Sequence, residues 1–111
     1  MAFERWDVVT ALFPFTETPV RKPRHVLVLS AGTFNIQHGH VIGCMITTAL
    51  RSRWPSDIPI VELVSTGLAH TSFVRWKLFT IPFELIGSQI GQLAESDRGP
   101  VAARMAYIFI A

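Results

Sequence analysis

Short β-prone segments, separated by turn signals, run through most of this 111-residue chain. Runs rich in Val, Ile, Leu and Phe alternate with stretches that hold Pro, Gly, Asn or Asp, which is typical of antiparallel sheets. Because Pro59 cannot donate to a ladder, its strand is expected at an edge or a bulge of the sheet. The runs predict strands at 7–13, 25–31, 40–48, 58–64 and 72–81, and a brief one at 88–93.

The end of the chain has a different pattern. Ser96 is a plausible N-cap with Asp97 in the first turn, and Pro100 is tolerable there only if it also lies in that turn. Apolar residues then follow at helical spacing at Val101, Met105 and Ile108. Since no repeat or linker divides the chain, we expect one domain over 1–111: a mainly β fold, a small antiparallel barrel or strongly bent sheet of five to six strands, closed by a C-terminal α-helix.

Membrane insertion and export are not expected. The longest apolar run, 41–50, is interrupted by two threonines and falls short of the ~20 residues that a membrane-spanning helix needs. Glu4 and Asp7 stand where a signal peptide carries a basic region. We therefore expect a cytoplasmic protein without a membrane segment.

Charge is distributed unevenly along the chain. The net charge is only +2, but the segment 18–56 contains no carboxylate. Such a segment either forms a solubilising surface or faces an anionic partner, and its length favours the partner. Arginine, which dominates the cations, suits bidentate contacts to phosphate. The basic residues of this segment are Arg21, Lys22, Arg24, Arg51 and Arg53.

The cysteine and histidine residues of the chain predict neither a metal site nor a cofactor. Cys44 is the single cysteine and lies in an apolar run, so it is expected in the core. His38 and His40 flank Gly39 with no third ligand nearby, which favours loop residues over ligands.

An arginine and a hydroxyl pair on consecutive predicted strands are the candidates for chemistry. Arg24 begins one strand, and Thr47 and Thr48 end the next; if these strands are close, both kinds of group could converge on a phosphate. Threonines at a strand end are also ordinary strand formers. His25 is a candidate proton shuttle, but its side chain should point away from that of Arg24 because neighbours on a strand face opposite sides. His70 lies in a predicted loop and is uninformative alone.

Several segments together resemble the MazF/PemK-like toxins of bacterial toxin–antitoxin systems. The likeness covers about residues 5–95, and departures from the family pattern are Trp6 for glycine, His25 for proline and Phe34 for tyrosine. The segments that carry it, in order, are "WDVVTALFPFTE", "KPRHVLVLS", "FN", "VIGCMITT" and "GLAHTSFVRWKLFTI…IGQL".

The resemblance implies an SH3-like barrel, a homodimer, a cognate antitoxin and metal-independent cleavage of single-stranded RNA. In that chemistry the ribose 2′-hydroxyl attacks the adjacent phosphate. Alignment with the family motifs places Arg24 on the catalytic arginine and Thr47 on the catalytic threonine. Arg21 and Lys22 would hold flanking phosphates, and Thr48, Arg75 and Lys77 complete the predicted RNA-binding set. Trp54 or Trp76 could stack on a base, although core packing or a dimer contact is the alternative for each.

Two other functions remain open at this level. One is a non-enzymatic gyrase poison of the CcdB type, which uses an apolar C-terminus ending in Trp-Gly-Ile; the present "AYIFIA" is apolar but lacks that motif. The other is an inactive interaction module whose basic loop binds an acidic partner.

Overall fold

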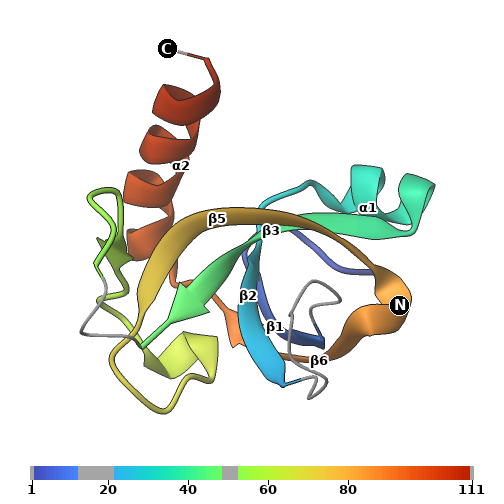
Figure 1. Ribbon diagram of the computed structural model, residues 1–111, viewed down its shortest axis with the longest axis horizontal. Helices are drawn as coiled ribbons and strands as arrows, with labels where there is room; N and C mark the ends of the chain where they lie inside the picture. The colour runs from blue at the N-terminus through green and yellow to red at the C-terminus, as the bar shows by residue number, and fades with distance from the viewer. Residues whose placement is uncertain (1, 13–21, 49–52, 111) are drawn as a thin grey trace.

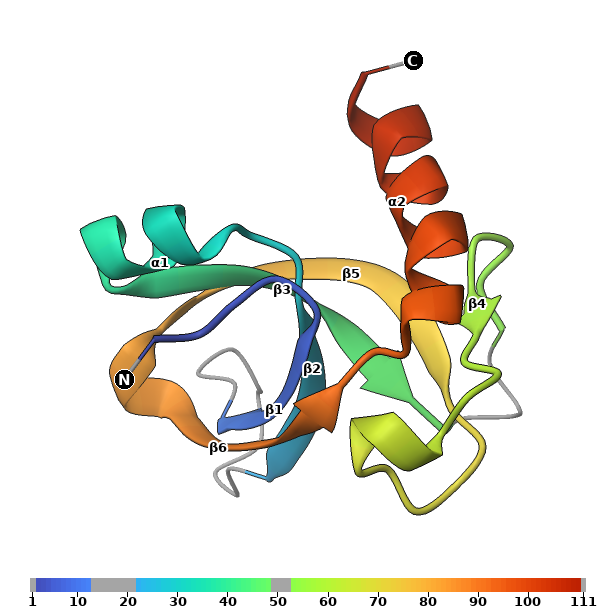
Figure 2. The ribbon, with the colours of Figure 1, turned by 180° about the vertical axis from the view of Figure 1, so that it is seen from behind.

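A six-stranded antiparallel sheet forms the body of the protein in the computed structural model, which describes residues 2–12, 22–48 and 53–110. The sheet is strongly curved and has the strand order β4-β5-β3-β2-β1-β6 (Figures 1 and 2). Its ladders among the described residues leave it open between the outer strands β4 and β6. The strands are β1 (Asp7–Leu12), β2 (Pro23–Val28), β3 (His40–Thr47), β4 (Ile58–Pro59), β5 (Phe73–Pro82) and β6 (Ile86–Gln92).

Two α-helices and two short 3₁₀ turns complete the fold. The helix α2 (Glu95–Phe109) packs its first turns near β4 and then projects away from the sheet toward the C-terminus (Figure 1). The shorter helix α1 (Gly32–His38) connects β2 to β3, and the 3₁₀ turns are η1 (Val64–Thr66) and η2 (Phe83–Leu85). The prediction of a mainly β fold with a C-terminal helix is therefore confirmed.

The curved sheet has an apolar cluster on each face. Successive residues of β2 alternate between the two, because neighbouring side chains on a strand point to opposite sides: Leu27 belongs to one cluster, and Val26 and Val28 to the other. The first cluster includes Cys44, which is fully buried as predicted. Burial raises the pKa of the Cys44 thiol to about 12, so this cysteine is a core residue.

Most predicted strands are confirmed within a few residues, but the strand expected at 58–64 is too long. Pairing with β5 stops at Pro59, and β4 is an outer strand as the proline requires. The backbone then leaves the ladder because other groups bind its amides. The carboxylate of Asp97 on α2 accepts hydrogen bonds from the N–H groups of Val61 (3.3 Å) and Glu62 (2.9 Å).

A helix, α1, stands where the sequence predicts only a loop. The side chain of Asn35 is fully buried and donates to the carbonyl of Phe3 (2.8 Å), which ties the helix to the N-terminal segment. Gly39 ends the helix in the left-handed conformation, at φ 64°. The sequence predicts loop residues around Gly39, but Gly39 is the C-cap of a helix.

The predicted start of α2 is also wrong. The N-cap is Ala94 and not Ser96, and no side chain caps the helix. Pro100 consequently lies beyond the first turn, at the sixth helical residue. The predicted apolar spacing holds for Val101, which is 1% exposed, but Ile108 is 41% exposed.

Trp6, one of the departures from the family pattern, has φ 78°. Residues other than glycine are rarely found at such φ angles, so a glycine would adopt this turn at a lower conformational free energy. Hydrogen bonds on both sides hold the conformation: the Trp6 N–H donates to the carbonyl of Val28 and the Trp6 carbonyl accepts from Leu93, both at 2.8 Å. The turn thereby joins β2 to the end of β6.

None of the helices in the described part of the chain has the length and apolar character that a membrane crossing requires.

Candidate functional site

A cavity of about 270 Å³ opens where β2 and β3 separate. The ladder between these strands has its last pair at His25 and Ile46. Beyond that pair Arg24 stays bonded to β1, whereas Thr47 pairs with β5. Figures 1 and 2 both show the two strands diverging toward this end. The cavity therefore lies in a gap that the sheet itself creates.

Four of the seven residues predicted to act on RNA line this one cavity. Arg24 and Lys22 approach from the start of β2, and Thr47 and Thr48 from the end of β3. The antiparallel register explains the meeting, since the first residues of one strand lie beside the last residues of its neighbour. Arg21 lies outside the described residues.

Two further residues of the cavity come from the loop before β5. His70 and Ser72 line it, and the hydroxyl of the buried Ser72 donates to the carbonyl of His70 (2.8 Å). The sequence predicts only a loop position for His70 and no role in a site. The register of β5 explains its place: because Phe73 pairs with Thr47, the residues just before Phe73 lie beside the end of β3.

His25 also lines the cavity, next to Arg24 in the strand. Its side chain and that of Arg24 do belong to opposite faces of the strand. Because the cavity occupies the gap beyond the last β2–β3 pair, it is bordered by residues of both faces.

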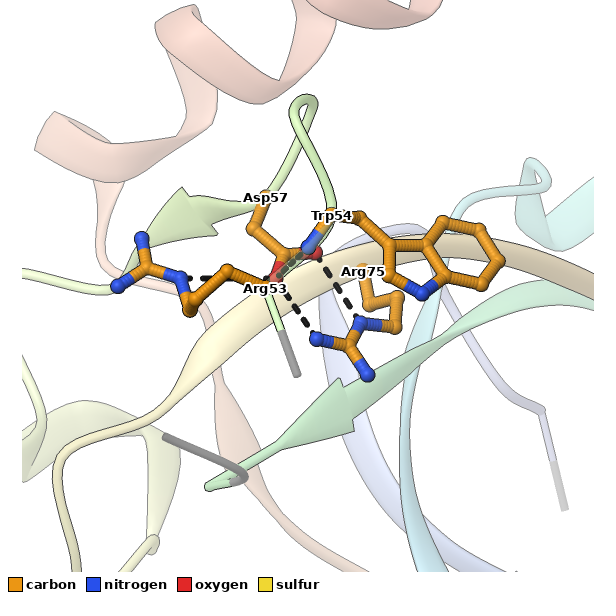
Figure 3. A network of polar contacts seen from close by, with 4 residues as sticks. All are labelled: Arg53, Trp54, Asp57 and Arg75. Atoms are coloured by element: carbon orange, nitrogen blue, oxygen red, sulfur yellow. Dashed lines mark hydrogen bonds and ion pairs between the residues drawn. The ribbon is translucent and has the colours of Figure 1, made fainter. Parts of the chain in front are cut away.

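Arg75, another predicted RNA contact, is buried and engaged with an aspartate (Figure 3). Its Nε and Nη2 donate to the two carboxylate oxygens of Asp57, at 3.2 and 2.9 Å. The hydrogen bonds from Arg75 hold the pKa of Asp57 below its usual range, and the same contact raises that of Arg75. Arg75 is thus part of an internal ion pair and only 7% exposed.

This ion pair holds an aromatic side chain at the surface. The N–H of Trp54 donates to Asp57 (3.0 Å), and the Arg75 guanidinium carbon lies 5.3 Å from the centre of the Trp54 ring. Trp54 remains 39% exposed (Figure 3). Trp76, by contrast, is 8% exposed and belongs to the core. Of the roles predicted for Trp76, core packing is therefore confirmed.

Arg53 is a further cation near Thr47, because it contacts Phe73, the β5 residue that pairs with Thr47. The Arg53 guanidinium carbon is 4.0 Å from the centre of the Phe73 ring, and Phe73 pairs with Thr47. Residues directly opposite in a sheet share a face, so Thr47 is on the same face of the sheet as the aromatic residue that Arg53 contacts. Arg53 also approaches Asp57 at 3.8 Å, yet half of its side chain is exposed.

Lys77 lies apart from these groups. It is exposed on β5, with its ammonium 6.0 Å from the centre of the Phe79 ring, and it does not line the cavity.

The cavity is electropositive. Its charged lining residues in the described part of the chain are Lys22 and Arg24, and no described carboxylate lines it. Asp57, the first acid after Thr48 along the chain, is paired with Arg75 and Arg53. Cations beside hydroxyl donors form a site suited to a phosphate group.

Solved structures with this fold include several bacterial toxins. Mycobacterium tuberculosis toxin MazF-mt6 is 26% identical, with a TM-score of 0.73, over 93% of this chain and 95% of its own. MazF from Deinococcus radiodurans is 14% identical, with a TM-score of 0.76, over 97% and 96% of the two chains. A mycobacterial endoribonuclease in complex with its cognate antitoxin is 17% identical, with a TM-score of 0.74, over 96% and 91%. A comparison with curated proteins gave no match.

The family comparison covers almost the whole chain. Residues 4–109 match the model of the PemK-like, MazF-like toxins of type II toxin–antitoxin systems. The matched range contains every described strand and the whole of α2. The chain therefore belongs to the PemK-like, MazF-like toxin family.

Proposed function

We propose that this toxin is an endoribonuclease that cleaves single-stranded RNA without a metal ion, by attack of a ribose 2′-hydroxyl on the adjacent phosphate. One observation carries the proposal: Arg24 and Thr47, which match the catalytic residues of the family, line the same cavity. The structural neighbours described as endoribonucleases support the reaction class.

The protein need not supply a nucleophile for this reaction. Its task is to hold the sugar and phosphate in line and to stabilise the charge that develops on the phosphorane oxygens. Arg24 supplies the positive charge, and Thr47 donates a hydrogen bond to a phosphate oxygen. Lys22, and Arg21 beyond the described residues, hold neighbouring phosphates, while Thr48 adds a hydroxyl at the rim.

Trp54 is the better placed of the two tryptophans to stack on a base. It is exposed, fixed by Asp57, and adjacent to the cation–aromatic pair beside Thr47. Arg75 then serves RNA binding by holding this platform, and Lys77 acts, if at all, on RNA outside the cavity.

We infer a homodimer and a protein antitoxin as partners. The last turn of α2 exposes a row of apolar side chains that a partner chain could cover: Tyr107, Phe109 and Ile110 are 62 to 85% exposed. The neighbour solved with its cognate antitoxin supports such a partner. Messenger RNA as a substrate places the toxin in the cytoplasm.

The test is cleavage of a long mixed-sequence RNA in the presence of EDTA. We expect the wild type to cut and Arg24→Ala to lose about 10³-fold or more in rate, as expected for an arginine that stabilises a phosphoryl transition state. Thr47→Val should lose about 10²-fold, since it removes one donor. Arg24 is exposed, so circular dichroism should show an unchanged fold.

Two outcomes would contradict the proposal. Absence of cleavage by the wild type on any long RNA removes the nuclease function, and full activity of Arg24→Ala removes the site. If growth arrest persists in Arg24→Ala but is lost on deletion of 108–111, the apolar end of α2 carries the toxicity, as in a gyrase poison of the CcdB type.

A further inference from the structure

The proposed cleavage requires two proton transfers. A new bond forms between the 2′-oxygen and phosphorus, and the bond between phosphorus and the 5′-oxygen breaks. The 2′-hydroxyl must give up its proton, and the departing 5′-oxygen must gain one. The products are a 2′,3′-cyclic phosphate and a 5′-hydroxyl, so a base and an acid are needed and no other reactant.

Few groups in the cavity can exchange a proton near neutral pH. The titratable described side chains that line it are Lys22, Arg24, His25 and His70, and the remaining polar ones are the hydroxyls of Thr47, Thr48 and Ser72. A guanidinium does not give up its proton in proteins, and hydroxyls of Ser and Thr are weak acids and bases. Imidazole is the side chain that both accepts and donates protons between about pH 5 and 8.

The two histidines border the cavity from different sides. His25 is held within the sheet, where it pairs with Thr10 on β1 and with Ile46 on β3. His70 lies across β3 in the loop before β5, and the bond from Ser72 to its carbonyl fixes the backbone there. Both residues are exposed, which leaves their rings accessible to a substrate.

We propose that His25 and His70 act as the proton acceptor and the proton donor of RNA cleavage, a proposal that rests on the nuclease function above. One imidazole takes the proton of the 2′-hydroxyl, and the other, as imidazolium, delivers a proton to the 5′-oxygen. Arg24 and Thr47 stabilise the phosphate between them. A histidine in the place of the family's usual proline thereby becomes a functional feature of this chain.

The first test is the dependence of kcat/KM on pH, measured in EDTA. The wild type should give a bell-shaped profile, because the acceptor must be neutral and the donor protonated. His25→Gln and His70→Gln should each lose about 10²-fold or more and each flatten one limb. His38→Gln, which changes an exposed histidine at the end of α1, is the matched control and should keep the wild-type profile.

A modified RNA separates proton donation from a structural role. When sulfur replaces the 5′-oxygen at the cleavage site, the thiolate leaves without a proton. The variant that lacks the donor should regain the wild-type rate on this RNA, and the variant that lacks the acceptor should not. A merely structural histidine would give equal losses on both substrates.

The outcomes distinguish this proposal from the nuclease function. If the wild type cuts RNA and either histidine variant keeps its rate and pH profile, the proton-transfer pair is overturned and the nuclease remains. If both variants lose activity and neither recovers on the sulfur-containing RNA, the donor assignment is overturned. If the wild type cuts no RNA, the nuclease function itself fails.

Discussion

The carboxylate of Asp57 organises the residues around Trp54, and its removal should destabilise the protein. Its side chain is inaccessible to solvent and receives two hydrogen bonds from Arg75. Hydrogen bonds to charged groups contribute about 1.5 to 3 kcal/mol each in favourable settings. Asp57→Asn keeps the shape but sets an amide N–H₂ group against the guanidinium, so we expect a loss of about 1 to 3 kcal/mol in the free energy of unfolding at pH 7.

The effect should depend on pH. Because the pKa of Asp57 is lowered in the folded state, its stabilisation is present above the ordinary carboxyl pKa of about 3.9 and is lost as the pH falls through the lowered value. The difference between wild type and Asp57→Asn in urea denaturation should therefore shrink from pH 7 to pH 3. Glu62→Gln, at an exposed carboxylate, is the control. Equal stability of Asp57→Asn and wild type at pH 7 would contradict this account.

At the level of single residues, the sequence predicted contacts set by strand order better than contacts set by loops. Arg24 and Thr47 could be paired in advance because antiparallel neighbours bring a strand start beside a strand end. The contact of Arg75 with Asp57 joins residues that are 18 positions apart, one on β5 and one just before β4, so the hydrophobic periodicity of the sequence did not indicate it. The role of His70 in the cavity likewise required the register of β5.

Two glycines with open space around their Cα atoms allow the same substitution to be tested in two backbone conformations. A Cβ built at Gly99 in α2, or at Gly39 after α1, meets no atom within 4 Å. Gly99 lies within a helix, where alanine is favoured over glycine by about 0.5 to 1 kcal/mol. Gly39 has φ 64°, where a side chain costs roughly 1 to 2 kcal/mol. We expect Gly99→Ala to stabilise the protein and Gly39→Ala to destabilise it.

Urea denaturation of the two variants beside the wild type measures both effects, and each variant controls for the other, since packing is equally open at both sites. A shift of the same sign in both would show that backbone conformation does not decide the outcome.

The elements that the sequence predicted poorly were those whose ends are fixed by distant groups. The strand predicted at 58–64 was too long because the N–H groups of Val61 and Glu62 donate to the carboxylate of Asp97, on α2, and not to a neighbouring strand. The helix α1 was missed because its seven residues carry little periodic signal, and a buried Asn35 holds it. The longer strands β3 and β5, with strong apolar patterns, were placed within a residue or two.

At the scale of the whole molecule, the fold gathers charge that the sequence spreads out. The segment 18–56 has no carboxylate, and the structure brings its described cations Lys22, Arg24 and Arg53 to the cavity or to the strand beside it. The acids of the described residues do not line the cavity, and Asp57 is paired with arginine. A modest net charge of +2 therefore coexists with one strongly cationic region, which is the arrangement that attracts a polyanion.

This arrangement predicts how RNA binding responds to salt. Each phosphate that a cation neutralises releases counterions, and for single strands the slope of log K against log salt is about −0.7 per contact. We expect Lys22→Gln to weaken binding of an RNA made uncleavable by a 2′-O-methyl group and to reduce the magnitude of the slope by about 0.7. Arg104→Gln on α2 removes the same charge away from the cavity and should leave the slope unchanged. Fluorescence anisotropy between about 50 and 200 mM salt covers the range in which such contacts change affinity most. If the two variants change the slope equally, RNA responds to net charge, and the cavity does not position its phosphates.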